Sequence, residues 1–147
     1  MNHFSEMPAP KPHLTQIDGR TYDVRKLESS AALLPTNHFD LTKWNTLQSV
    51  IDGKYWNDTN GAALGPKDLI EAYGTSESNW SEVLKKHPSW SEHVAKIQRV
   101  SYQTPVLVYK GNIIDGIHRL TKALLENAAS IPYKNLDRLP ADAEYNA

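Results

Sequence analysis

The sequence predicts a small α+β domain. Its last third contains a β-rich run, a Gly-Asn turn, a second short β-rich run, a helical repeat of apolar residues and a further β-rich run. Apolar residues upstream recur mostly at helical spacing. With 147 residues, of which 39% are hydrophobic, the chain is long enough to bury one ordinary core. We therefore expect a short mixed sheet with helices packed around it.

The N-terminal residues 1–15 are expected to form a flexible arm, followed by one domain over residues 16–147. Three prolines lie among small and polar residues in the arm, and this composition disfavours helix and sheet alike. The alternation in Arg20–Val24 predicts a short strand. The spacing of apolar residues then predicts a helix over residues 25–34, which Pro35 would end.

A loop at residues 35–38 is expected to separate this helix from the next. Asp40 is expected to cap the second helix, whose apolar residues form one stripe up to Asp52-Gly53: Leu41, Trp44, Leu47, Val50 and Ile51. Residues 54–65 are rich in Gly, Asn, Asp and Thr and predict a loop, in which Trp56 is a candidate lid over a ligand. Pro66 suits the first turn of a helix running to about residue 73.

Two further helices are predicted before residue 100, split near Pro88. Asn79 and Ser89 each lie three residues before a glutamate, which is the spacing of a capping box. His87 and His93 lack the spacing of a helical metal site, so we expect them on a solvated surface. The four tryptophans are expected mainly in the core.

The last third predicts a hairpin, a helix and a strand. Residues 104–110 and 113–115 form the hairpin around Gly111-Asn112, and apolar residues at helical spacing follow from 116 to about 126. Residues 130–134 predict the final strand. A strand therefore passes directly into a helix at Asp115-Gly116.

This junction is the main candidate site. The first amides of a helix have no internal partners and favour an anion, and Gly116 allows close approach. Beyond it, His118, Arg119 and Lys122 are potential cations, and Arg119 could hold a phosphate by two parallel hydrogen bonds. The alternative is that Asp115 merely caps the helix, Gly116 relieves the turn and the basic side chains are solvated.

The run TPVLVYKGNIIDGIHRLTKALLENAASIPYKNL, with a DGxHR motif at Asp115–Arg119, resembles the core of the ParB/sulfiredoxin superfamily. The likeness extends over about residues 90–136. It implies a small α+β fold in which the helix amides and its arginine hold nucleotide phosphates. The resemblance implies ligand binding at Gly116, His118 and Arg119. Ile117 and Lys122, which lie beside them on the expected helix, complete the set of candidate ligand-binding residues. Asp115 and His118 are the implied catalytic residues, with Asp115 also as a metal ligand.

Differences from the motifs of individual superfamily members exclude some of the activities that the resemblance would otherwise suggest. Sulfiredoxins have a catalytic cysteine where this chain has Ile117, and CTP-dependent ParB clamps have G-E-R-R where it has G-I-H-R. We expect neither activity, nor a helix-turn-helix domain after the fold. Superfamily kinases with D-G-H-H-R are more similar, but they use a glutamate from an early loop, and residues 35–38 contain none. Glu28 or Asp40 could replace it.

Three functions therefore stay open. The first is phosphoryl transfer that depends on ATP, ADP or another nucleotide with Mg²⁺ and acts on an unidentified small-molecule acceptor. The second is a ParB-like nuclease or another protein acting on nucleic acid, which would add basic side chains: Lys110, Lys122, Lys134 and Arg138. The third is a non-catalytic nucleotide-binding or regulatory module.

Composition excludes several other classes. A net charge of −1 and a pI near 6.6 disfavour duplex binding driven mainly by phosphate attraction. Without cysteine there is no disulfide, thiolate nucleophile or Cys-ligated zinc. The sequence has no apolar run of membrane-spanning length and no signal-peptide pattern at its start. We therefore expect a soluble, cytoplasmic protein with no membrane partner.

Overall fold

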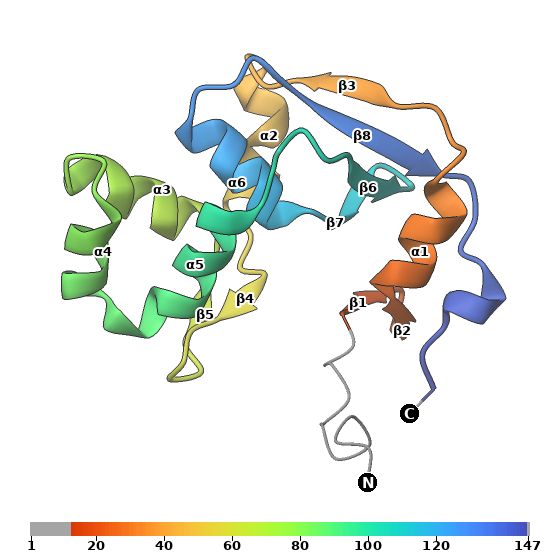
Figure 1. The fold of residues 1–147 in the computed structure, drawn as a ribbon, viewed down its shortest axis with the longest axis horizontal. Coiled ribbons are helices and arrows are strands. Elements are labelled where there is room, and N and C mark those ends of the chain that lie inside the picture. The colour runs from red at the N-terminus through yellow and green to blue at the C-terminus, as the bar shows by residue number, and fades with distance from the viewer. Residues whose placement is uncertain (1–12, 147) are drawn as a thin grey trace, which may run out of the picture.

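The computed structural model describes residues 13–146, without the side chains of residues 44–46. A sheet with helices on both faces forms one part of the molecule, and helices α3 to α5 form a second part beside it (Figure 1). The strands are β1 (Leu14–Ile17), β2 (Arg20–Asp23), β3 (Asn37–Asp40), β4 (Trp56–Asn57), β5 (Ala63–Leu64), β6 (Val106–Tyr109), β7 (Asn112–Asp115) and β8 (Ser130–Leu136). The helices are α1 (Val24–Ala31), α2 (Trp44–Ile51), α3 (Pro66–Thr75), α4 (Trp80–Lys86), α5 (Ser91–Arg99) and α6 (Ile117–Leu125), with 3₁₀ turns η2 (Pro88–Trp90) and η3 (Ala141–Ala143).

The main sheet is mixed and has the strand order β3-β8-β6-β7. Strands β6 and β7 form an antiparallel hairpin, β8 pairs parallel with β6, and β3 pairs antiparallel with β8. The parallel pair requires a crossover, which α6 provides. Strands β3 and β7 therefore lie at opposite edges of the sheet.

Consecutive residues of β6 contribute to cores on the two faces of the sheet, because side chains alternate along a strand. Leu107 belongs to a core with Leu27 of α1 and Tyr22 of β2. Val106 belongs to a second core with Leu120 of α6 and Leu47 of α2. The hairpin β1–β2 and α1 thus cover one face, and α2 and α6 cover the other.

The helical part has its own apolar cluster. Leu69 of α3 and Val94 and Ile97 of α5 are fully buried there. Trp56, Trp80 and Trp90 are partly buried against this cluster, which agrees with the core role expected for tryptophan. The side chain of Trp44 lies outside the described part of the structure.

The predicted α+β class, the hairpin and the helix-strand unit after it are confirmed. The loop expected at residues 35–38 is wrong in part, because Asn37 and His38 pair with β8 as part of β3. The cap expected at Asp40 is also wrong, because its carboxylate accepts hydrogen bonds from Thr42 and α2 begins only at Trp44.

Three smaller expectations can also be compared with the structure. Asn79 caps α4 by accepting from the Ser81 amide. Ser89 caps no helix, because its hydroxyl donates instead to Asp58. Most of the arm expected at 1–15 lies outside the described residues, which begin at His13, and Leu14 and Thr15 belong to β1. In the described part of the chain no helix combines the length and apolar character needed to cross a membrane.

Candidate functional site

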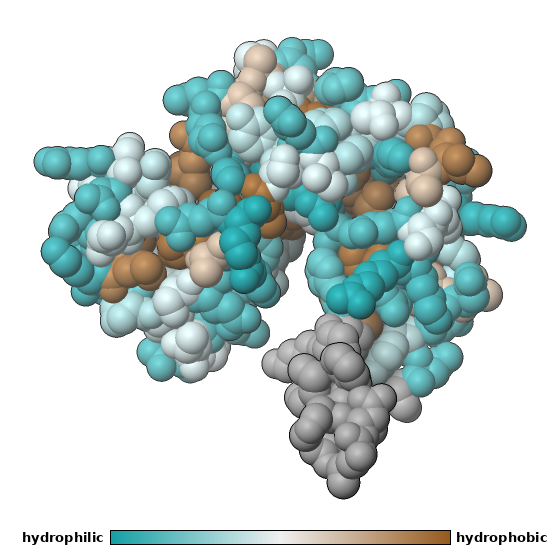
Figure 2. Space-filling model, in the orientation of Figure 1, coloured by the Kyte–Doolittle hydropathy of each residue, from teal (hydrophilic) through white to brown (hydrophobic). Residues whose placement is uncertain are grey.

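The N-terminus of α6 opens into a cleft of about 920 Å³. Strands β1 and β7 line one side, and β4 and α5 line the other. The surface is hollowed between the helical part and the β1–β2–α1 part (Figure 2). Charged side chains from both sides reach the cleft, among them Lys96, Lys110 and Asp115.

Gly116 makes the turn from β7 into α6. Its φ of 111° is in the left-handed region, where a side chain is strained. A Cβ built at this position would lie 2.5 Å from Val106 Cγ1. The glycine is therefore required both by its backbone angle and by the close approach of α6 to β6.

Helix α6 begins without a side-chain cap. The sequence-based expectation that Asp115 caps it is wrong, because the capping position is Gly116. The first intrahelical hydrogen bond runs from the Leu120 amide to the Gly116 carbonyl. The amides of Ile117 and His118 thus precede the hydrogen-bonded turns, as expected for an anion-receptive helix end.

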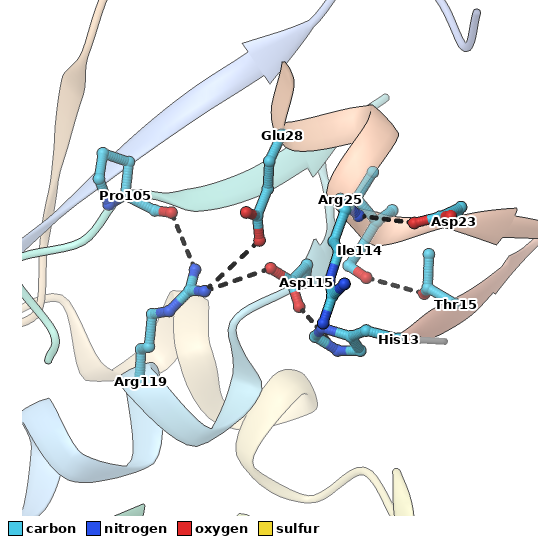
Figure 3. A network of polar contacts seen from close by, with 9 residues as sticks. All are labelled: His13, Thr15, Asp23, Arg25, Glu28, Pro105, Ile114, Asp115 and Arg119. Atoms are coloured by element: carbon cyan, nitrogen blue, oxygen red, sulfur yellow. Dashed lines mark hydrogen bonds and ion pairs between the residues drawn. The ribbon is translucent and has the colours of Figure 1, made fainter. Parts of the chain in front are cut away.

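Asp115 is buried in an ionic network (Figure 3). Its side chain is only 7% exposed, with Oδ1 3.5 Å from His13 Nε2 and Oδ2 3.5 Å from Arg119 Nη2. Oδ2 has no hydrogen-bond partner among the described residues. A buried carboxylate oxygen without a hydrogen bond is costly, and the Arg119 guanidinium at 3.5 Å offsets part of that cost.

Arg119 points away from the cleft and toward β6 and α1 (Figure 3). Its Nη1 donates to the Pro105 carbonyl at 3.0 Å, and its Nη2 lies 3.9 Å from Glu28 Oε1. The guanidinium, 16% exposed, is thus shared among protein groups. Arg119 does not line the cleft, so its bidentate phosphate contact stays a prediction that would require these contacts to change.

Of the two acidic residues considered as replacements for the kinase glutamate, Glu28 lies near the network, through its contact with Arg119. Asp40, the other candidate, accepts hydrogen bonds from Thr42 instead. Residues 37 and 38 lie on β3, at the sheet edge opposite β7. The segment expected to bring a reactive group to the site is therefore separated from β7 by two strands, β8 and β6.

His118 forms a three-ring cluster with His93 of α5 and Trp56 of β4. His118 Nε2 lies 3.0 Å from His93 Nδ1, and the planes of the two imidazoles are within 9° of parallel. The Trp56 indole stacks on both, with centroid distances of 4.3 Å to His118 and 5.1 Å to His93. His93 Nε2 lies 2.8 Å from the Asn57 carbonyl oxygen. The two histidines are therefore joined edge to edge beneath one indole.

His118 is expected to be a neutral group. Burial lowers its pKa from 6.5 to about 3, and the neighbouring basic groups His93, Lys96, His13 and Arg119 act in the same direction. The sequence-based view of His118 as a potential cation is thus wrong near neutral pH. Its neutral ring offers one donor and one acceptor.

Two of the remaining basic side chains suggested by the sequence donate hydrogen bonds to backbone carbonyls outside the cleft. Lys122 donates to the carbonyls of Gln98 and Val100 at the end of α5 and does not line the cleft. Lys134 donates to the last carbonyls of α1. Lys110 is at the hairpin turn and lines the cleft. These lysines do not form a continuous basic path.

An apolar cavity of about 410 Å³ adjoins the cleft on the α2 side of the sheet. The two hollows share Tyr55, Asn112, Ile113 and Ile117. Ile117, at the start of α6, therefore lies at the boundary between the two hollows. The carboxylate, the histidine pair and the lysines lie at the larger cleft, where we place the chemistry.

Sequence reasoning missed His93, which is 7% exposed rather than solvated. Trp56 belongs to the short strand β4 rather than to a loop, stacks on the histidine pair and lines the cleft, so its role as a lid over a ligand stays a prediction. One signal was available, because His93 lies four residues before Ile97 and beside Val94, on the apolar face of α5. The contact with Asn57 depends on tertiary packing.

Comparisons with protein-family models, curated proteins and solved structures found no match. The functional argument therefore depends on the geometry of the cleft and on the DGxHR motif at its base. These two together define a candidate anion site at a strand-to-helix junction.

Proposed function

We propose that this chain is a ParB-like protein that binds the phosphates of ATP or another nucleotide in the cleft and transfers a phosphoryl group to a small-molecule acceptor. The single observation that carries the proposal is the uncapped N-terminus of α6, which opens at Gly116 into a cleft large enough for a nucleotide. The amides of Ile117 and His118 would receive phosphate oxygens.

Charge around the cleft supports phosphate binding at its rim. Lys96 enters from α5 and Lys110 from the β6–β7 turn, so cations flank the helix end on two sides. Such flanking charges add to the favourable field of the helix N-terminus. Arg119 would act mainly through Asp115, with which it is paired.

Asp115 fits the role of a metal ligand or proton acceptor. Mg²⁺ in nucleotide sites is held by one or two carboxylates together with substrate phosphates, and it supplies charge neutralisation on the transferred group. The carboxylate of Asp115, a residue that lines the cleft, would provide such a ligand. In the transfer, an acceptor hydroxyl oxygen bonds to the terminal phosphorus as the bond to the nucleoside diphosphate breaks. Asp115 would take the hydroxyl proton.

The placement of the basic residues gives less support to the nuclease alternative. Two of its four proposed side chains, Lys122 and Lys134, are tied to helix C-termini. A groove that follows a nucleic-acid backbone would need charges along its length. The non-catalytic alternative differs from our proposal only in the chemistry after binding, which an experiment separates.

Thermal unfolding with ATP, ADP, CTP and inorganic tripolyphosphate, each with and without Mg²⁺, tests binding. A ligand present at 100 times its Kd stabilises the native protein by about 2.7 kcal/mol. We expect a shift with at least one nucleotide, and a smaller one in Lys110→Gln. Lys85→Gln on α4, whose side chain is exposed and absent from the cleft, is the matched control.

The chemical step is tested with terminally labelled nucleotide and a panel of hydroxyl compounds. Transfer of label to a compound, abolished in Asp115→Asn, supports the kinase assignment. Binding without transfer or hydrolysis would support the non-catalytic alternative. Cleavage of DNA or RNA in the absence of nucleotide would support the nuclease alternative, and no shift with any nucleotide would remove the proposal.

A further inference from the structure

The histidine pair determines which atom of His118 is left for a ligand. The Asn57 carbonyl can only accept, so His93 Nε2 at 2.8 Å must carry a proton. A neutral His93 then has an unprotonated Nδ1, which accepts from His118 Nε2 at 3.0 Å. A neutral His118 with its proton on Nε2 has a lone pair on Nδ1.

This lone pair has no partner in the described part of the protein. His118 lines the cleft, and no hydrogen bond from a described residue reaches Nδ1. The Trp56 indole covers one face of the His118 imidazole, so a polar contact would have to form at the edge of that ring. A half-buried acceptor beside a ligand cleft favours a ligand that brings a donor.

The charged groups around the pair favour the neutral form. Lys96 comes from the same helix as His93, Arg119 from α6, and His13 from the segment before β1. Asp115, the buried carboxylate on β7, is itself paired with Arg119 and His13. Additional positive charge on the ring would therefore meet Lys96 and Arg119, and the Asp115 carboxylate is already shared between Arg119 and His13.

We propose that His93 and the Asn57 carbonyl hold His118 in the Nε2–H tautomer, and that Nδ1 of His118 accepts a hydrogen bond from a hydroxyl or amino group of the bound nucleoside. This inference rests on the proposed nucleotide site. Phosphate oxygens are repelled by a lone pair, so the phosphates lie against the α6 amides and Lys110. The nucleoside is the part of the ligand that carries O–H and N–H donors. His93 is a positioning residue, whereas His118 touches the ligand.

The tautomer is tested in the free protein by ¹⁵N NMR of the histidine side chains at neutral pH. We expect a protonated Nε2 and an unprotonated Nδ1 on His118. His93→Asn keeps an acceptor oxygen near the position of Nδ1, and should preserve this pattern. His93→Gln keeps the donor to Asn57 but removes that acceptor, and should change it. A protonated Nδ1 in the wild type overturns the proposal whether or not nucleotide binds.

The contact is tested with two matched variants of His118. His118→Asn retains an acceptor near Nδ1 and should bind ATP within about threefold of the wild type. His118→Gln retains a donor toward His93 but no acceptor near Nδ1, and should bind ATP about tenfold more weakly. Tripolyphosphate has no nucleoside, so both variants should bind it as the wild type does.

The outcomes separate this inference from the proposed function. Equal ATP affinity in His118→Gln and the wild type overturns the nucleoside contact while leaving the phosphate site intact. Equal loss of ATP and tripolyphosphate in His118→Gln also overturns it, because the defect would then lie in phosphate binding. Absence of binding by both ligands in the wild type removes the proposed function and the contact together, whereas the NMR pattern reports the tautomer alone.

Discussion

Gly116 lies against Val106 so closely that a Cβ on the glycine would be 2.5 Å from Val106 Cγ1. This contact joins the start of α6 to the strand beneath it, and it fixes the direction in which the first helix amides point. Because Val106 is fully buried, it has little room to move aside. The cleft and the core therefore share one packing contact.

Gly116→Ala should destabilise the fold by about 2–4 kcal/mol, because it adds backbone strain to a steric clash. Gly111→Ala is the matched control, since Gly111 also has a positive φ but has open space where its Cβ would be. Chemical denaturation measures both. Equal losses in the two variants would show that the contact with Val106 contributes nothing beyond the backbone angle.

Asp115 and Arg119 should be energetically coupled. A double-mutant cycle with Asp115→Asn and Arg119→Gln should give an interaction free energy of about 1 kcal/mol or more, because the carboxylate is buried. The exposed pair Glu82 and Lys85 provides the comparison, with an expected value below about 1 kcal/mol. A coupling for the buried pair no larger than that of the exposed one would contradict the network.

Stability should fall as the pH is lowered, in part because of His118. Its pKa in the folded protein is lowered to about 3, from 6.5. Between these values the unfolded chain binds a proton that the folded protein does not, so the free energy of unfolding decreases with falling pH. The contribution to the slope is at most about 1.4 kcal/mol per pH unit.

The pH effect is measured by urea unfolding at several pH values. His118→Asn should flatten the dependence, whereas His38→Gln, which alters an exposed histidine on β3, should leave it as in the wild type. Parallel curves for His118→Asn and the wild type would mean that the residue does not differ in protonation between the folded and unfolded states.

Replacing Trp56 by leucine should raise the pKa of His118 toward its ordinary value. Burial is the largest cause of the lowered pKa, and the indole covers the imidazole at a centroid distance of 4.3 Å. Side-chain NMR titration measures the change. Trp80→Leu removes an indole that packs in a tilted arrangement against Tyr73 instead, and should leave His118 unaffected.

Lys122→Met should reduce stability by about 0.5–1.5 kcal/mol without weakening ATP binding. Its ammonium group donates to the carbonyls of Gln98 and Val100, where α5 ends. Lys96→Met should show the reverse, because Lys96 lines the cleft. Loss of ATP affinity in Lys122→Met at constant stability would restore the ligand-binding role that its sequence position suggested.

Local sequence signals accounted for the C-terminal third of the fold. The alternation of the two strands, the turn between them and the apolar stripe through Leu120 depend on neighbouring residues, so they can be read along the chain. The turn itself is Lys110-Gly111 rather than the expected Gly111-Asn112, because Asn112 already pairs with Tyr109 in the hairpin. The segment at residues 37–40 could not be read in this way. Its strand exists because β8 supplies hydrogen-bond partners from the other end of the chain.

The residues of the candidate site fall into the same two groups, those that a local motif predicts and those that only tertiary packing brings together. Asp115, Gly116 and His118 were found from one short motif, and the structure places all three at the cleft. Their partners were not found, because His93 and Trp56 approach His118 from segments 25 and 62 residues away in the sequence. Arg119 was found, but its direction depends on Glu28 and Pro105, which only the folded chain brings near.

The strand pairings of the main sheet differ in how far apart in the sequence their partners lie, and this difference has a consequence for the order of folding. The β6–β7 hairpin closes over two residues, and α6 follows it at once, so these contacts cost little loop entropy. The pairing of β3 with β8 joins positions almost a hundred residues apart, such as Phe39 and Ile131. We therefore expect the hairpin and α6 to form early and β3 to dock late, with hydrogen exchange slowest in β6 and fastest at the β3 edge.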